Sequence, residues 1–458
     1  MRLLKIILKV VAVLFIIALI ITSWIAWKVF PAVSGYGAKN MCSAVFIQHR
    51  KPADIINEDL DFFPMTLGSF TLNEKDSSVT GTVWGFAKRK AIYRERIGCT
   101  LINDLTEDEI RKQQFAIPSQ PVVSKDTIAW PYGDKIMDTV PPNIDRVVLN
   151  TAIDSAMTAY RDGKPGYTRA MLVLYDGKII AEKYAPGFDI NTRLLGWSMS
   201  KSLTAAMIGV LVKQGKLTVD APAPVAEWKG TDKEKITLKN LLQQSTGLDF
   251  TEIYDRPSDV TKMLFSTGDM AAYTASRPLA AEPGTVFNYS SGNSNILSRI
   301  IRKTAGENDY AGFPFKELFY KINAYSFILE PDASGTYIGS SYSYGTARDF
   351  ARFGLLYYNN GVWNGEQLLP ENWVKDTREP CAANKFRRYG YQFWLNGLNE
   401  KEPTSLRFPD APADMYFCNG FGGQSVFIIP SKKLIVVRLG IREIDRNKFL
   451  KEIIAAVK

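Results

Sequence analysis

Residues 196–212 read GWSMSKSLTAAMIGVLV, which places Ser198 and Lys201 three positions apart at the start of an apolar, helix-forming run. Positions i and i+3 share one face of a helix, so the lysine amine can reach the serine hydroxyl. The helix N-terminus adds a positive field and free N–H groups near Ser198. Serine needs a base to act as a nucleophile, and a desolvated lysine can be that base. The spacing alone is also typical of a lysine on a solvated helix face.

The single histidine, His49, limits the chemistry that can accompany this serine. A Ser-His-Asp hydrolase or a histidine-rich metal site would have to use it. We interpret Ala44–His49 as a strand that runs into a loop, which makes His49 a surface residue. We therefore expect covalent catalysis in this chain to use a base other than histidine.

The segments around the serine-lysine pair predict an α+β fold. A hairpin is indicated by two apolar runs joined by Asp176-Gly177. In chain order the pattern gives helix 147–160, strands 169–175 and 178–184, a mostly helical stretch 198–358, strands 425–429 and 434–438, and an amphipathic helix 446–457. An antiparallel sheet flanked by helices, with a helical lobe, fits this order. A cleft between the two lobes is the expected place for a site.

The N-terminal residues have the pattern of a membrane segment. The uncharged run Val10–Trp27 has 18 residues and follows Arg2, Lys5 and Lys9. As a helix it would span roughly 27 Å, close to the thickness of a bilayer core. We therefore expect residues 1–30 to anchor the chain in a bacterial inner membrane, with the catalytic region outside the cytoplasm. Cleavage as a signal peptide is the alternative, and it would release a secreted protein.

The rest of the chain is predicted to form two regions. Short β-type runs such as Ser78–Trp84 indicate a small β-rich N-terminal region with its linker, residues 36–140, whose role the sequence does not give. The main domain covers residues 145–458. The chain has 46% apolar and 22% charged residues, and its net charge of +9 comes from scattered rather than clustered side chains. This distribution argues against a nucleic-acid-binding surface.

The cysteine positions suggest two disulfides. Cys42 and Cys99 bracket an N-terminal segment, and Cys381 and Cys418 bracket a C-terminal one. The absence of a CxxC pair argues against a zinc ribbon. A chain outside the cytoplasm can keep disulfides, so both pairs are disulfide candidates, the first more strongly than the second, with free buried thiols as the alternative.

Several ordered stretches of the chain resemble the serine β-lactamase and penicillin-binding-protein superfamily. The resemblance covers residues 145–450 and is greatest to the class C-like branch with 6-aminohexanoate-dimer hydrolase and related esterases. The matching stretches are Ser198–Lys201 (SMSK), Ile236–Leu248 (ITLKNLLQQSTGL), Glu282–Gly292 (EPGTVFNYSSG), Tyr344–Gly354 (YGTARDFARFG) and Gly361–Gly365 (GVWNG). Each stretch is modest alone, but chance would not give all five in this order. The resemblance implies a β-lactamase-like fold.

The resemblance also implies roles for individual residues. Ser198 would be the acylated nucleophile, and Tyr289 would pass protons between Ser198 and the leaving group. Lys201 would keep Tyr289 reactive and share the proton transfer, and the choice of base between Lys201 and Tyr289 stays open. The backbone N–H groups of Ser198 and Phe421 would form the oxyanion hole.

Two departures from the family pattern concern the substrate. Class C enzymes have Tyr-x-Asn at the second motif, whereas this chain has Ser291 in place of the amide. Their third motif carries a cation that binds a penicillin carboxylate, whereas the matching segment Cys418–Gln424 reads CNGFGGQ. The dimer-hydrolase branch has a similar cation-free form. We expect Ser291, Gly420, Gly423 and Gln424 to line the substrate site, and we expect β-lactams to be poor substrates.

The sequence therefore predicts a serine hydrolase that cleaves an amide or ester of a small molecule through an acyl-enzyme on Ser198. No metal or other cofactor is implied. A D-Ala peptidase or a β-lactamase is the enzyme alternative. The alternative from a different class is a penicillin-binding-type sensor, or a scaffold, that does not turn over. The intact set of Ser198, Lys201 and Tyr289 disfavours a scaffold, and the rate of deacylation separates an enzyme from a sensor.

Overall fold

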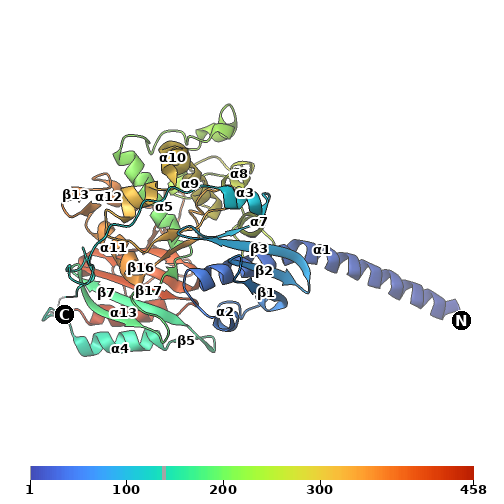
Figure 1. Cartoon of the computed structure of the whole chain (residues 1–458), viewed down its shortest axis with the longest axis horizontal. Coiled ribbons are helices and arrows are strands. Elements are labelled where there is room, and N and C mark those ends of the chain that lie inside the picture. The colour runs from blue at the N-terminus through green and yellow to red at the C-terminus, as the bar shows by residue number, and fades with distance from the viewer. Residues whose placement is uncertain (1, 137–140) are drawn as a thin grey trace. The chain divides into compact units, whose positions relative to one another are not determined.

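The computed structural model describes residues 2–136 and 141–458, which fold into two compact units (Figure 1). The N-terminal unit comprises Met1–Arg94, Cys99–Arg111 and Thr251–Gly268, and the C-terminal unit comprises Glu95–Gly98, Lys112–Phe250 and Asp269–Lys458. The segment Thr251–Gly268, from the middle of the sequence, thus belongs to the N-terminal unit. The division of the sequence at residues 1–30, 36–140 and 145–458 stays a prediction.

The C-terminal unit is built on a six-stranded sheet in which every neighbouring pair is antiparallel. The strands follow one another across the sheet as β14 (Trp394–Leu395), β15 (Tyr416–Gly420), β16 (Gln424–Ile429), β17 (Leu434–Gly440), β7 (Thr168–Tyr175) and β8 (Lys178–Tyr184). The predicted hairpin at Asp176-Gly177 joins β7 to β8, and the first and last parts of the domain therefore meet in one sheet.

Helices cover both faces of this sheet because its central strands alternate between two cores. Leu172 and Leu174 of β7 lie in one core with α5 (Met199–Lys213) and α11 (Ala347–Tyr358). Met171 and Val173 lie in the other, with α4 (Arg146–Met157) and α13 (Arg446–Ala455). The period of two along a strand produces this division. The three-layer arrangement confirms the predicted β-lactamase-like α+β fold (Figure 1).

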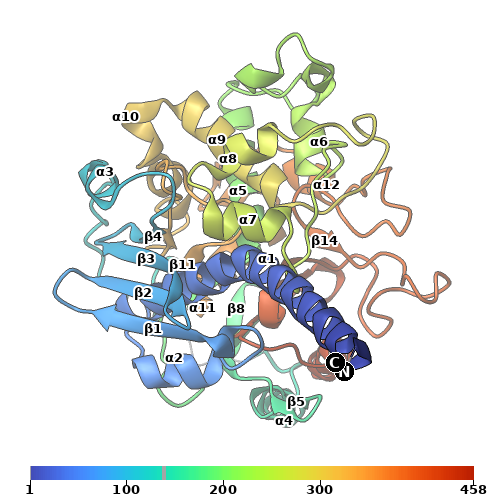
Figure 2. The ribbon, with the colours of Figure 1, turned by 90° about the vertical axis from the view of Figure 1, so that its right-hand side faces the viewer.

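A helical lobe adds to the α5 side of the sheet, as Figure 2 shows for α5, α6, α8, α9, α10 and α12. Its helices are α6 (Leu238–Leu242), α8 (Met270–Ala275), α9 (Ser291–Ala305), α10 (Glu307–Tyr310), a π-helical turn (Phe315–Phe319) and α12 (Trp373–Thr377). A small sheet orders β10 (Ile328–Leu329), β11 (Ser343–Gly345) and β9 (Leu194–Leu195). Short pairs join β5 (Tyr160–Arg161) to β6 (Lys164–Pro165) and β12 (Val362–Trp363) to β13 (Glu366–Gln367).

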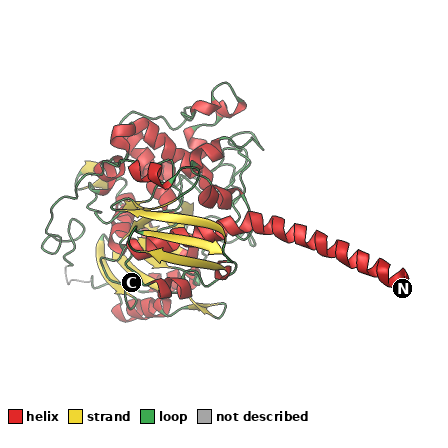
Figure 3. Cartoon of the chain, turned by 45° about the vertical axis from the view of Figure 1, so that its right-hand side comes forward, coloured by secondary structure: helices red, strands yellow, loops and turns green. Residues whose placement is uncertain are grey.

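The N-terminal unit is a long helix packed on a four-stranded antiparallel sheet (Figure 3). Its elements are α1 (Arg2–Phe46), α2 (Pro52–Glu58), β1 (Gly68–Asn73), β2 (Ser78–Val83), β3 (Phe86–Arg94), β4 (Gly98–Leu101), α3 (Glu107–Lys112) and α7 (Asp259–Ser266). A Cβ on Gly81 would lie 2.3 Å from the carbonyl oxygen of Ser34, so glycine lets α1 approach β2 closely. The ring of Tyr36 in α1 contacts that of Phe265 in α7, 5.5 Å between centroids.

The structure corrects two expectations for the N-terminal residues. The expected strand at Ala44–His49 is wrong, because α1 continues to Phe46 and its last turns are buried against β2 and β3. The expected membrane anchor at residues 1–30 is not supported by the structure, in which Arg2 begins the 45-residue helix α1. Within the described part of the chain, no helix is long and apolar enough to cross a membrane.

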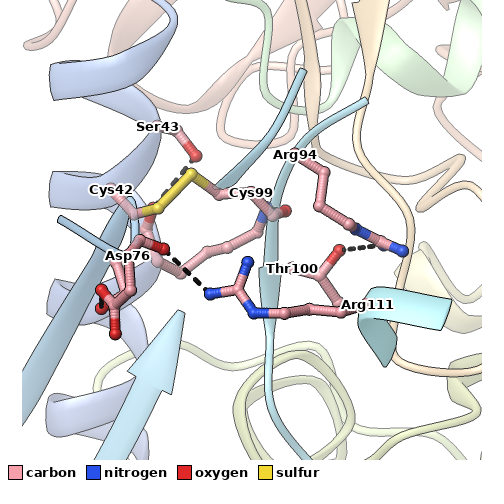
Figure 4. The surroundings of a disulfide bond; sticks show 9 residues. Cys42, Ser43, Asp76, Arg94, Cys99, Thr100 and Arg111 are labelled. Carbon is pink, nitrogen blue, oxygen red and sulfur yellow. Dashed lines mark hydrogen bonds between the residues drawn. A yellow bond between two sulfur atoms is a disulfide. The ribbon is translucent and has the colours of Figure 1, made fainter. Parts of the chain in front are cut away.

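One of the two expected disulfides forms. Cys42 of α1 is bonded to Cys99 of β4, and Figure 4 shows Arg94 donating to Thr100 beside it. The second pair is wrong, since Cys381 and Cys418 are both free and buried. Cys418 points from β15 into the core shared with α5, whereas Cys381 lies in the loop after α12.

Candidate active site

The backbone turns sharply just before Ser198. Strand β9 pairs with β11, and the N–H of Gly196 continues this pairing by donating to the carbonyl of Ser343 at 2.8 Å. Trp197 then has φ +48°, and Ser198 is the N-cap of α5. A bulky residue at positive φ is uncommon, and strained backbone of this kind clusters at active sites. The turn leaves Ser198 partly exposed at a helix N-terminus, where its own N–H is free of helical partners.

Lys201 is buried directly beneath Ser198. Its side chain is 1% exposed, and Nζ donates to Ser198 Oγ at 3.1 Å, Ser291 Oγ at 3.0 Å and the carbonyl oxygen of Ser340 at 3.0 Å. A protonated lysine has three N–H donors, which these three oxygens match. A neutral amine keeps two N–H donors for Ser291 and Ser340 and turns its lone pair toward the hydroxyl of Ser198. Both protonation states of Lys201 therefore fit the same geometry, which proton transfer requires.

Tyr289 lies on the other side of Lys201, at the end of an extended loop before α9. Nζ of Lys201 is 4.9 Å from the centroid of the Tyr289 ring. The ring also contacts Tyr389 and Trp394, with centroid separations of 5.7 Å and 5.3 Å. Tyr289 is partly exposed. The structure thus brings together the three side chains that the sequence predicted as catalytic.

A buried glutamine holds the loop that carries Tyr289. Gln244 is fully buried, and its side-chain oxygen accepts from the N–H of Ser290 at 3.1 Å and from Nδ2 of Asn293 at 2.8 Å. Its main-chain oxygen accepts from the N–H of Asn288 at 2.8 Å. These contacts hold the backbone N–H groups of Asn288 and Ser290, the residues on either side of Tyr289.

A second glutamine anchors the first. Gln392 has φ +55° and is 2% exposed, and its Oε1 accepts from Gln244 at 3.2 Å and from Ser294 Oγ at 2.8 Å. Its Nε2 donates to the carbonyl oxygens of Leu241 and Leu242 at 2.9 and 3.1 Å. The sequence showed Gln244 only as part of the stretch Ile236–Leu248, and it gave no signal for Gln392, which comes from a distant loop.

Ser291, expected to line the substrate site, lies beneath Lys201. It is fully buried at the first residue of α9, and its hydroxyl accepts from Nζ of Lys201. In this position it helps to orient the lysine. Its expected part in substrate binding stays a prediction.

The turn between β15 and β16 lies against the peptide that precedes Ser198. A Cβ on Gly420 would lie 2.3 Å from the carbonyl oxygen of Gly196, so only glycine permits this approach. Phe421, the next residue, is 55% exposed, and its ring packs edge-on against Trp197 at 5.7 Å between centroids. The backbone of Gly420 and the ring of Phe421 therefore both lie against the residues just before Ser198.

The other predicted residues of this turn shape the backbone. Gly422 and Gly423 have φ of +74° and +79°, a conformation that side chains rarely adopt. Gln424 is 3% exposed and directs its amide to β17, where Oε1 accepts from the N–H of Gly440 at 2.9 Å and Nε2 donates to the Gly440 carbonyl. Gln424 thus ties the turn to the sheet, and its direct contact with substrate stays a prediction.

Position 418, in the segment that matches the cation-bearing third motif of class C enzymes, is a cysteine, as the sequence analysis noted. The thiol of Cys418 is 1% exposed, and burial raises its pKa to about 12, so it is neutral at physiological pH. No group of three or more His, Cys, Asp or Glu side chains within the described residues could hold a metal ion.

The fold and the site together are those of a serine hydrolase with a β-lactamase-like fold. The fold consists of an antiparallel sheet and a helical lobe, and the site has a buried lysine bonded to the serine that caps a helix. The family model described as "Beta-lactamase" matches residues 153–444. This match covers more than half of the chain, so the chain belongs to the beta-lactamase family, and the resemblance seen in the sequence is confirmed. Hydrolases of this superfamily include both β-lactamases and esterases.

Comparison with individual proteins gives the same result. The chain is 25% identical over 361 residues to "6-aminohexanoate-dimer hydrolase" of Paenarthrobacter ureafaciens, covering 72% of this chain and 81% of the relative. Two solved structures share the fold with TM-scores of 0.52 and 15% identity. One is a penicillin-binding protein homologue from Caulobacter crescentus and the other a family VIII carboxylesterase, and each match covers 70% of this chain and 99% of the solved one.

Proposed function

We propose that this protein hydrolyses a small-molecule amide or ester by two-step acyl transfer through Ser198. The carrying observation is the buried Nζ of Lys201, within hydrogen-bond distance of Ser198, Ser291 and the carbonyl of Ser340. In the first step the Ser198 oxygen bonds to the substrate carbonyl carbon while its proton moves to Lys201 or Tyr289. The leaving amine or alcohol then takes a proton as its bond to carbon breaks. Water repeats the sequence on the acyl-enzyme and releases the acid.

The tetrahedral oxyanion would be bound by the N–H groups of Ser198 and Phe421. A helix N-terminus and a glycine-rich turn both present backbone donors, and such donors stabilise charge that develops in the transition state. The packing of Gly420 on Gly196 and of Phe421 on Trp197 supports this pairing of donors.

A linear amide or a short ester is the substrate class that the site supports best. The neutral thiol of Cys418 offers no charge to a substrate carboxylate, and Ser291 faces the lysine. Both features disfavour β-lactams, the substrates of the β-lactamase alternative. The name of the relative from Paenarthrobacter ureafaciens suggests a small linear amide as the first compound to try.

The test is labelling with a fluorophosphonate followed by peptide mass spectrometry, together with rates for p-nitrophenyl esters, short amides and nitrocefin. We expect the adduct on Ser198 and ester or amide turnover well above that of nitrocefin. An adduct on another residue contradicts the mechanism. A stable acyl-enzyme that does not turn over supports the sensor alternative, and faster hydrolysis of nitrocefin supports a β-lactamase.

We also propose that the catalytic unit works outside the cytoplasm. The Cys42–Cys99 disulfide supports this location, because structural disulfides persist mainly in oxidising compartments. Alkylation of thiols in intact cells, before lysis, measures the redox state of the pair. We expect Cys42 and Cys99 to be protected from alkylation until reductant is added, and labelling of both without reductant contradicts the proposal.

A further inference from the structure

Arg438 of β17 is a fully buried cation whose partners are neutral oxygen atoms. Its side chain is 0% exposed. Nη1 donates to the carbonyl oxygens of Gly422 and Gly423, both at 3.0 Å. Nη2 donates to the carbonyls of Gly166 at 3.2 Å and Arg442 at 2.8 Å, and Nε donates to Thr168 Oγ1 at 3.1 Å. These five hydrogen bonds therefore engage all five N–H groups of the guanidinium.

A gain in folding stability alone does not explain why a charged side chain is buried here. Burial lowers the pKa of Arg438 to about 10, which leaves it charged at neutral pH. No carboxylate among the described residues forms an ion pair with it, and the nearby Glu443 pairs instead with Arg446, 3.1 Å between Oε2 and Nε. Burial outweighs the charge of Glu443, which favours the charged guanidinium, and lowers the pKa of Arg438. Burial of a charge is normally disfavoured, and apolar side chains can replace buried ionic groups without loss of stability. The position of the guanidinium therefore needs another explanation.

The explanation lies in which carbonyls the guanidinium holds. Gly422 and Gly423 continue the turn that begins at Phe421, whose N–H is the proposed second oxyanion donor. A Cβ on Gly423 would lie 2.7 Å from Nη1 of Arg438, so the glycine is what allows the guanidinium to lie against the turn. The contacts with both carbonyl oxygens hold two successive peptide groups of this turn. Gln424 holds the same turn from its other end through Gly440.

We infer that Arg438 is a positioning residue for acyl transfer, which fixes the Phe421–Gly423 turn so that the Phe421 N–H meets the oxyanion. This inference rests on the proposed function and adds to it a residue that touches neither substrate nor the reacting atoms. Loss of a direct oxyanion donor lowers kcat about 10²- to 10³-fold, and loss of its support should cost less, about 10- to 100-fold. KM should change little, because the ground-state carbonyl binds these donors weakly.

The experiment compares Arg438→Lys, Arg438→Met and Arg438→Ala with the full-length wild type. Burst kinetics with p-nitrophenyl acetate give the acylation rate, and inhibition by phenylboronic acid reports binding of a tetrahedral adduct. We expect kcat and boronate affinity to fall together across the series, with Arg438→Lys the least affected. Added methylguanidinium should restore part of the lost activity of Arg438→Ala and should leave the rate of the wild type unchanged.

Arg352→Met is the matched control. Arg352 is also almost fully buried, at 1% exposure, but it pairs with Asp349 and Asp134, both at 2.7 Å. Its loss should lower the melting temperature without the boronate effect. Arg438 variants that lose stability but keep kcat and boronate affinity would overturn the inference. If the wild type neither hydrolyses the ester nor labels at Ser198, the proposed function itself fails, so the two failures are distinct.

Discussion

On one side of the candidate site, Ser198, Lys201 and Tyr289 are held by hydroxyl and amide side chains, with Gln244 and Gln392 at the centre. On the other side, the turn Phe421–Gly423 is held through its own backbone by Arg438 and by the neighbouring Gln424. The first side contains the groups that would exchange protons. The second supplies only fixed backbone dipoles. Substitutions on the first side should therefore remove chemistry, whereas substitutions on the second should slow it.

The largest effect should come from Ser198→Ala. Loss of the nucleophile should reduce esterase activity about 10⁴-fold or more, since loss of the serine nucleophile of a hydrolase costs this much or more. Stability should change by less than about 1 kcal/mol, because the side chain is partly exposed. Rates with p-nitrophenyl acetate and urea unfolding measure the two quantities. Activity retained in a folded variant contradicts the assignment.

Lys201→Met should come next, with a loss of about 10²- to 10⁴-fold, the range of general base catalysis. Methionine has a similar length but cannot accept the proton of Ser198. It also leaves Ser291 Oγ and the Ser340 carbonyl without their donor, which should cost about 1–3 kcal/mol in stability.

The double variant with Ser198→Ala is the control for this effect. Because the two residues would act as one unit, the double variant should be no slower than Ser198→Ala alone. A multiplicative loss would show that Lys201 acts independently of the nucleophile.

Gln244→Ala tests whether the amide network, rather than the motif residues alone, sets the position of Tyr289. The substitution removes the acceptor of the Ser290 N–H and of Nδ2 of Asn293, which should cost about 1–3 kcal/mol each. We expect kcat to fall about tenfold or more, because small displacements of a catalytic group are expensive. Gln214→Ala is the matched control, since the exposed side chain of this glutamine bonds Glu317 and no other described side chain. Unchanged kcat in Gln244→Ala would show that the network is merely structural.

The sequence predicted the first side of the site better than the second, for a physical reason. Ser198 and Lys201 lie on one helical turn, so a local spacing encodes their contact, and the β7–β8 hairpin is equally local. Arg438 and Gly423 meet only because β16 and β17 pair, and Gln392 reaches Gln244 from a loop almost 150 residues away. No periodicity marks such contacts. The Cys381–Cys418 pair failed for the same reason, because bracketing in sequence says nothing of which way Cys418 faces.

The smallest effect on catalysis should come from Cys418→Ala. This substitution removes a neutral thiol on β15 that is buried in the core shared with α5. Its consequence should appear instead in how stability depends on pH. The thiol has a pKa raised from 9.0 to about 12 in the folded protein, because burial disfavours the thiolate. Above pH 9 the unfolded chain loses this proton while the folded protein keeps it. Stability from this group is therefore complete below about pH 9 and decreases as the pH rises toward 12.

Urea unfolding at pH 8 and pH 10.5 measures this dependence in the wild type and in Cys418→Ala. One proton contributes about 1.4 kcal/mol per pH unit, so the stability advantage of the wild type over the variant should shrink by up to about 2 kcal/mol between these conditions. The comparison cancels the titration of tyrosines, which both proteins share. An advantage that is equal at both pH values would show that the thiol does not stay protonated in the core. Such a result would put a negative charge beside α5 and require a new account of how the site keeps Lys201 ready to accept a proton.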